Sequence, residues 1–131
     1  TLGWSGPKLL SSIASARRGA FLQHLIAQFE RFDVLALPVA QVWPFDLSRH
    51  WPKTVAGRAM DTYHRWMEVV VPASPLGFPV LNVPVGFDAQ GRSMGMQIIG
   101  AHHADWSVLQ LGAAYEKATG WVERRPPPLL G

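Results

Sequence analysis

The sequence predicts an α/β fold in which a mixed sheet of about three strands is flanked by helices. Three observations lead to this prediction: a long helical pattern near the start, two apolar runs around a turn, and a second helical pattern after them. The chain has 131 residues, which is the length of one domain. We therefore expect one α/β unit, or one sector of a larger fold.

The first helix is predicted from about residue 8 to residue 31. One face carries apolar side chains at i, i+3, i+4 and i+7: Leu22, Leu25, Ile26 and Phe29. A short apolar run, 34–37, follows and is closed by Pro38. A continuous apolar run suits a strand buried on both faces, as in parallel or mixed sheets.

Residues 39–54 are predicted to form a long loop, in which Trp43 and Trp51 each precede a proline. Loops of this length are often functional. A second helix is predicted over 55–70. Its apolar stripe consists of Ala59, Tyr63, Trp66, Met67 and Val70.

The stretch SPLGFPVLNVPVGF, residues 74–87, combines an apolar run with three prolines. A proline cannot donate to a sheet, so we expect a short strand over 80–83 with Pro79 and Pro84 at its ends. The turn residues of 88–92 and the apolar run 94–100 then predict a hairpin.

A last helix is predicted over 105–119. Asp105 is a suitable N-cap, and Gly120 a suitable stop. Residues 121–131 contain three consecutive prolines, and we expect them to form an extended tail.

Composition limits the classes of protein that fit this chain. Apolar residues make up 48% and charged residues 16%, whereas an average domain is roughly 25% charged. We therefore expect other protein to cover much of the surface. The net charge is +3 but the basic residues are dispersed, which argues against nucleic-acid binding.

Location and cofactors follow from what the sequence lacks. No apolar run approaches the roughly 20 residues of a membrane span, and no leader pattern opens the chain, so a cytoplasmic location is expected. There is no cysteine for a thiolate site, and we expect neither a metal nor a cofactor. Because the first residue is Thr1, we expect a fragment.

The residues do not form a complete active site. Asp61 and His64 are three apart and could touch, but a catalytic pair would also need a nucleophile. Ser11 and Ser12 lie inside a predicted helix, without the free backbone donors of an oxyanion hole. A surface pair and structural hydroxyls are the simpler interpretations. No catalytic residue is expected in this chain.

Tryptophan is the most informative residue type for a binding site. Five of these side chains could line an apolar pocket: Trp43, Trp51, Trp66, Trp106 and Trp121. Aromatic residues on a helix stripe more often belong to a core. Trp43 is the better pocket candidate because it lies on a loop.

Three ordered blocks resemble the C-terminal part of amidase signature enzymes. These are Gly77-Phe78-Pro79, Pro84-x-Gly86-Phe87 and Gly95-x-Gln97-x-x-Gly100, preceded by Asp33-x-Leu35-x-x-Pro38. The resemblance runs from about Leu10 to Trp121. Residues 92–94, Arg-Ser-Met, depart from the Gly-Leu-Pro that is typical there.

The resemblance implies an enzyme that hydrolyses amide C–N bonds. That family uses a serine nucleophile, a second serine in a cis peptide and a lysine, all in the N-terminal part of its domain. None of these groups lies in this chain. Residues 1–131 are therefore expected to be the C-terminal part of an amidase signature domain, which contributes sheet scaffold and part of the substrate pocket.

Three side chains are expected in that pocket: Trp43, Trp66 and Met67. The similar transamidosome subunits that use glutamine carry an acidic residue where Met67 falls, with Glu68 beside it. The apolar Met67 and Trp66 favour a less polar amide substrate.

The expected partners are the missing N-terminal part of the same domain, or a second copy of the chain, and a small amide. Neither nucleic acid nor membrane is expected. The alternative is a non-catalytic, truncated, amidase-derived protein for oligomerisation or interaction, which low charge and absent catalytic groups also fit.

Overall fold

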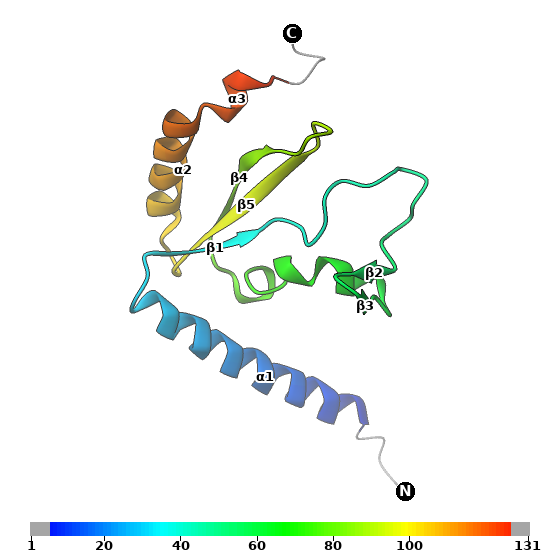
Figure 1. The fold of residues 1–131 in the computed structure, drawn as a ribbon. Helices are drawn as coiled ribbons and strands as arrows, with labels where there is room; N and C mark the ends of the chain where they lie inside the picture. The colour runs from blue at the N-terminus through cyan, green and yellow to red at the C-terminus, as the bar shows by residue number, and fades with distance from the viewer. Residues whose placement is uncertain (1–5, 127–131) are drawn as a thin grey trace, which may run out of the picture. The chain divides into compact units, whose positions relative to one another are not determined.

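The computed structural model describes residues 6–126, with side chains from residue 11 onward. The chain divides into two compact units, Thr1–Asp33 and Val34–Gly131. Their elements appear in Figure 1. The first unit consists of α1 (Gly6–Phe29), which confirms the first predicted helix. Its end is closed by the amides of Arg31 and Phe32, which both donate to the Gln28 carbonyl at 3.0 Å.

The second unit contains a sheet of β1 (Val34–Pro38), β4 (Val80–Phe87) and β5 (Ser93–Gly100) in the order β1-β5-β4. This confirms an α/β fold with three main strands. Both pairings are antiparallel, so the described strands contain no parallel pair. β1 lies at an edge and is only half buried, although its apolar run suggested burial on both faces.

The β4–β5 hairpin is confirmed, and residues 88–92 form its turn. The predicted end of the first strand at Val83 is wrong, because β4 continues through Pro84 to Phe87. The register shifts between Pro84 and Gly86, which marks a β-bulge. An edge strand with a bulge accommodates proline, since the missing donor is not needed there.

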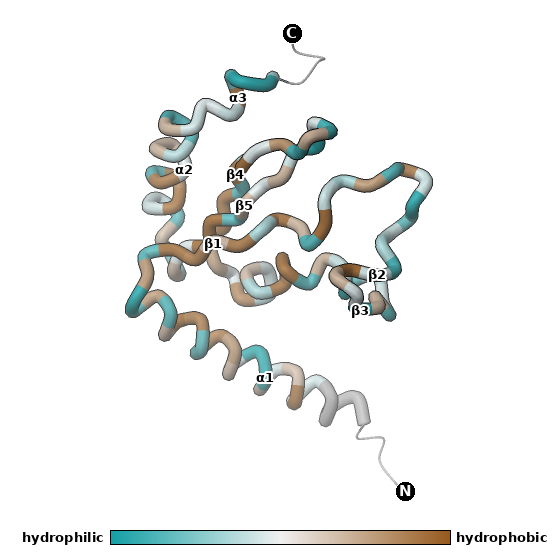
Figure 2. The backbone as a smooth tube through the Cα atoms, in the orientation of Figure 1, coloured by the Kyte–Doolittle hydropathy of each residue, from teal (hydrophilic) through white to brown (hydrophobic). Residues whose placement is uncertain are grey.

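α2 (Asp105–Thr119) covers one face of the sheet and confirms the last predicted helix. Figure 1 shows it alongside β4 and β5. The core on this face consists of Val83, Ile98 and Val108, with Val34, Leu81, Met96 and Tyr115 packed against it. Figure 2 shows the apolar character of these strands and the polar turn at the end of the hairpin.

The N-terminal end of α2 differs from expectation, and its C-terminal end does not. Ala104 occupies the N-cap, and Asp105 is the first helical residue instead. Gly120 ends the helix in the left-handed conformation, as predicted, with φ 59°. A short helix, α3 (Trp121–Arg124), then replaces the start of the predicted extended tail, and residues 127–131 lie outside the described part.

The predicted helix over 55–70 is wrong. Its first part is a small hairpin of β2 (Thr54–Val55) and β3 (Arg58–Ala59), and its second part is the 3-10 helix η1 (Tyr63–Val70). Ala56 and Gly57 both have positive φ, 49° and 78°, which reverses the chain and excludes a helix there. A second 3-10 helix, η2 (Ser74–Leu76), follows.

The η1 segment lies against the face of the sheet opposite to α2. Side chains alternate along a strand, so Gln97 points away from the core residue Ile98. The Gln97 side-chain amide donates to the Val69 carbonyl of η1 at 3.1 Å. Thus α2 packs on one face of the sheet, and η1 is hydrogen-bonded to a side chain on the other face.

Candidate functional site

A hollow of about 260 Å³ lies where the loop after β1 meets η1 and the start of β5. It is lined by residues 39, 40, 42–45, Trp66 and 93–95, and we call it the aromatic hollow. The structure brings two of the three predicted pocket residues together here, Trp43 and Trp66. Met67 is not among the lining residues; it interrupts η1 with φ −113° and ψ 16°.

The loop wall of the aromatic hollow is attached at several points. The Val39 amide donates to the Gly95 carbonyl at 3.1 Å, which continues the pairing of β1 with β5. Further along, the Gln41 side chain accepts a hydrogen bond from the Val69 amide at 3.1 Å. These bonds fix the first residues of a segment that the sequence predicted only as a long loop.

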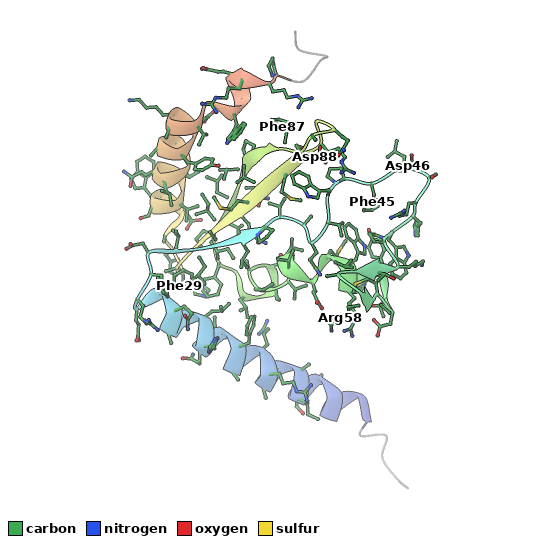
Figure 3. The ribbon with its side chains drawn as sticks, viewed as in Figure 1. Phe29, Phe45, Asp46, Arg58, Phe87 and Asp88 are labelled. Atoms are coloured by element: carbon green, nitrogen blue, oxygen red, sulfur yellow. The ribbon has the colours of Figure 1, made fainter. Side chains whose placement is uncertain are left out.

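Aromatic contacts continue from the hollow along η1. The Phe45 ring, labelled in Figure 3, meets the Trp66 ring edge-on with centroids 5.6 Å apart. Tyr63 stands 6.1 Å from Trp66 and 6.3 Å from Trp51. Among the described residues the buried Trp66 Nε1 has no hydrogen-bond partner.

The charged turn of the β4–β5 hairpin directly precedes Ser93, which lines the aromatic hollow. Asp88, labelled in Figure 3, accepts bonds from the Arg92 Nε at 2.6 Å and from the Arg92 amide at 2.8 Å. Burial acts to raise the pKa of the Asp88 carboxyl. The bonds from Arg92, its positive charge and the Gln90 amide outweigh burial and lower that pKa below its ordinary value.

Gln97 and Gly95 show what the third sequence block, Gly95-x-Gln97-x-x-Gly100, does in the fold. It is 3% exposed, and its Nε2 donates to the Pro38 carbonyl at 2.8 Å as well as to Val69. At Gly95, two positions earlier, a Cβ would stand 3.0 Å from the Val39 side chain and 3.2 Å from the Val83 carbonyl. The block therefore joins β1, β5 and η1, which the sequence alone did not reveal.

The remaining polar candidates are paired with other residues. Asp61 forms an ion pair with Arg65 at 2.6 Å. The spacing in the sequence had suggested His64 as its partner instead. Glu68 pairs with Arg58 at 3.2 Å, and both side chains are exposed.

Two further polar groups lie apart from these pairs. Hydrogen bonds from the Ser48 side chain and backbone lower the pKa of the Asp46 carboxyl, in the loop after β1. The His102 ring packs 4.3 Å from Phe78.

A larger hollow, about 370 Å³, lies between β4 and the C-terminal half of α2. Its lining includes Leu81, Leu109, Tyr115 and Trp121. Of the five tryptophans considered as pocket residues, only Trp121 lines this second hollow. Trp106 is 71% exposed on α2 and lines neither of the two.

Residues 6–126 contain no cluster of three or more His, Asp or Glu side chains that could hold a metal ion. Within the same residues, every helix is too short or too polar to cross a membrane.

Comparisons with known proteins agree with the sequence blocks. The Amidase family model matches residues 8–109. The chain is 33% identical over 115 residues to a fatty acid amide hydrolase of Medicago truncatula, covering 86% of this chain and 18% of that protein. It is 30% identical to an acylamidase of Rhodococcus erythropolis, with coverage of 89% and 24%.

Amidotransferases are also among the relatives. The A subunit of a glutamyl-tRNA(Gln) amidotransferase of Cyanothece sp. is 33% identical, with coverage of 79% of this chain and 20% of that protein. Among solved structures, a bacterial aryl acylamidase of the amidase signature family superposes with a TM-score of 0.77 at 28% identity, over 86% of this chain and 23% of the other. The chain thus spans about a fifth of the length of the relatives it matches.

Proposed function

This chain belongs to the amidase signature family, and from that premise we propose that it forms the C-terminal part of an enzyme that hydrolyses amide C–N bonds. The observation that carries the proposal is the family match over residues 8–109, which contains all three sequence blocks. The chain supplies the antiparallel sheet, its covering helices and one wall of the substrate site.

The chemistry proposed for the whole enzyme runs through serine and lysine groups outside these 131 residues. A serine oxygen attacks the amide carbon, the C–N bond breaks and the amine leaves with a proton. Water then attacks the acyl ester, which releases the carboxylic acid and restores the serine. This chain contributes no group to these steps, and on its own it is expected to be inactive.

The proposed role of the aromatic hollow is to receive the apolar part of the amide. Its walls include Trp43, Phe45 and Trp66, and its volume of about 260 Å³ suits a ring or a short alkyl group. Met67 lies outside the lining, and its contact with substrate stays a prediction.

Apolar walls favour a hydrolase of less polar amides over the A subunit of a glutamyl-tRNA(Gln) amidotransferase. Where the transamidosome subunits hold a substrate amine with an acidic residue, this chain has Met67, and the neighbouring Glu68 is paired with Arg58. The cytoplasmic location stays a prediction that cell fractionation can check.

The test uses the intact protein that contains this chain. Purified enzyme is assayed with a small amide, such as acetamide, and with an anilide that carries a bulky apolar group. We expect hydrolysis of the anilide, and we expect Trp43→Ala and Trp66→Ala to raise its KM roughly tenfold or more, since each removes a large apolar contact.

The matched control is Trp106→Ala, because the same side chain is removed at a position on α2 that does not line the aromatic hollow. Its KM should stay within about twofold of the parent value. An intact enzyme that cleaves no amide would overturn the proposed function. Equal KM values for all three variants would overturn the role of the hollow.

A further inference from the structure

Arg92 makes an unusual set of contacts for an exposed turn residue. Its Nε and Nη2 both approach Asp88 Oδ2 at 2.6 Å, and Nη2 also donates to the Gln90 side chain at 3.1 Å. Its Nη1 reaches across to the Pro44 carbonyl at 3.1 Å. One guanidinium thus joins the hairpin turn to a loop 48 residues earlier in the chain.

Pro44 belongs to the wall of the aromatic hollow, between Trp43 and Phe45. The next residue after Arg92, Ser93, lines the same hollow from β5. The loop is held at its start by Val39 and Gln41. Within the described residues, the bond from Arg92 is the next hydrogen bond that ties the loop to another part of the unit. The Arg92 side chain thus ties the Pro44 wall to the hairpin turn, which leads directly into the Ser93 wall.

We propose that Arg92 is a positioning residue that fixes the Trp43–Phe45 wall of the aromatic hollow and so sets which apolar groups fit. The inference rests on the proposed function, because it assumes that the hollow receives substrate. Arg92 itself touches no reacting group. It acts through the Pro44 carbonyl, whose neighbours on both sides carry the aromatic rings of the wall.

Arginine is required for this role by its geometry. The planar guanidinium presents several donors in fixed directions, so it can hold the Asp88 carboxylate and the Pro44 carbonyl together. Lysine concentrates its donors on one nitrogen and cannot reproduce both bonds with the same spacing. Arg92 also falls within the three residues where this chain departs from the Gly-Leu-Pro that is typical of the family.

The experiment compares Arg92→Ala and Arg92→Lys in the intact enzyme with acetamide and a bulky anilide. For Arg92→Ala we expect a roughly tenfold rise in KM for the anilide, since hydrogen bonds to a charged group are lost. We expect kcat for both substrates and KM for acetamide to stay within about twofold. Arg92→Lys should fall between the parent and the alanine variant.

Arg49→Ala is the matched control, because Arg49 lies in the same loop and carries the same charge but does not line the hollow. It should leave both KM values unchanged. If Arg92→Ala affected both substrates equally, or no more than Arg49→Ala, the positioning role would be overturned.

A second measurement does not depend on activity. The ¹⁹F NMR signal of fluorotryptophan at Trp43 should shift or broaden in Arg92→Ala and stay unchanged in Arg49→Ala. If the intact protein cleaves no amide, the proposed function fails, and this signal still decides whether Arg92 holds the wall. An unchanged Trp43 signal in Arg92→Ala would overturn the inference even in an active enzyme.

Discussion

Gln97 is the residue on which the join between sheet and η1 depends. Its side-chain amide group donates to two carbonyls, Pro38 and Val69, in a place from which water is excluded. Each such hydrogen bond contributes little net free energy to stability, but removing the side-chain amide leaves two buried carbonyls without donors, which is costly.

Gln97→Leu is therefore expected to lower the free energy of unfolding by about 1–3 kcal/mol, because both carbonyls lose their partner. Urea unfolding followed by circular dichroism measures the change. Gln110→Leu, at an exposed position of α2, should stay within about 0.5 kcal/mol. Similar values for both variants would contradict the structural role assigned to Gln97.

The turn around Asp88 predicts a dependence on pH. The pKa of Asp88 is lowered, so the stabilisation of the turn is present above the ordinary carboxyl pKa, near ~4, and is lost as the pH falls through the lowered value. The charges that face it include Arg92, and Arg125 lies over the neighbouring Phe87 ring at 4.6 Å.

NMR shifts of the Gly91 and Arg92 amides should report this acid transition. In Asp88→Asn the transition at these amides should disappear, because no carboxylate remains to be protonated. In Asp105→Asn, outside the turn, it should persist. Persistence of the transition in Asp88→Asn would show that another group causes it.

At the scale of elements, α2 depends on one close approach to β4. A Cβ at Gly112 would overlap the Leu81 side chain, whereas a Cβ at Gly19 of α1 would meet no atom within 4 Å. Replacing each glycine by alanine therefore separates two effects. At Gly112 the substitution tests the cost of overpacking, and at Gly19 it tests the gain in helix propensity.

Gly112→Ala should lower the free energy of unfolding by about 1–3 kcal/mol, because overpacking exceeds the gain in helix propensity. Gly19→Ala should not destabilise, and should raise the helix content of α1. Thermal and urea unfolding of both variants measure the difference. A stabilised Gly112→Ala protein would mean that α2 does not approach β4 as closely as described.

Elements were predictable where local signals were strong. The hairpin followed from its turn residues, and α2 followed from its length and from Gly120. The region 55–70 was not predictable from its stripe, because two residues with positive φ reverse the chain at 56–57. Helical spacing of Tyr63, Trp66 and Val70 survives in η1, but as a 3-10 helix that packs on the sheet.

For the whole molecule, the exposed apolar side chains of α2 require a cover. Trp106 is 71% exposed and Leu109 is 54% exposed, and the sheet order leaves β1 and β4 as edges among the described strands. Apolar patches and open edges on a small domain promote association. This agrees with the low charge of the sequence.

The 131-residue chain expressed alone is therefore expected to sediment above its monomer mass of 14.5 kDa. Trp106→Glu should lower the apparent mass, since a charge opposes burial of the patch. Lys117→Glu, on the same helix, changes the charge without altering the patch and serves as control. A stable monomer would contradict the need for a cover and, with it, the alternative of an oligomerisation protein.

The sequence by itself determined the family, the hairpin and two long helices, because ordered motifs and local periodicity are properties of the sequence itself. It also grouped Trp43 and Trp66 as pocket candidates, and both line the aromatic hollow. Only the tertiary structure decided that Met67 lies outside the lining, that Gln97 joins three elements and that Arg92 holds Pro44. These facts depend on contacts between residues far apart in the chain, about which local patterns carry no information.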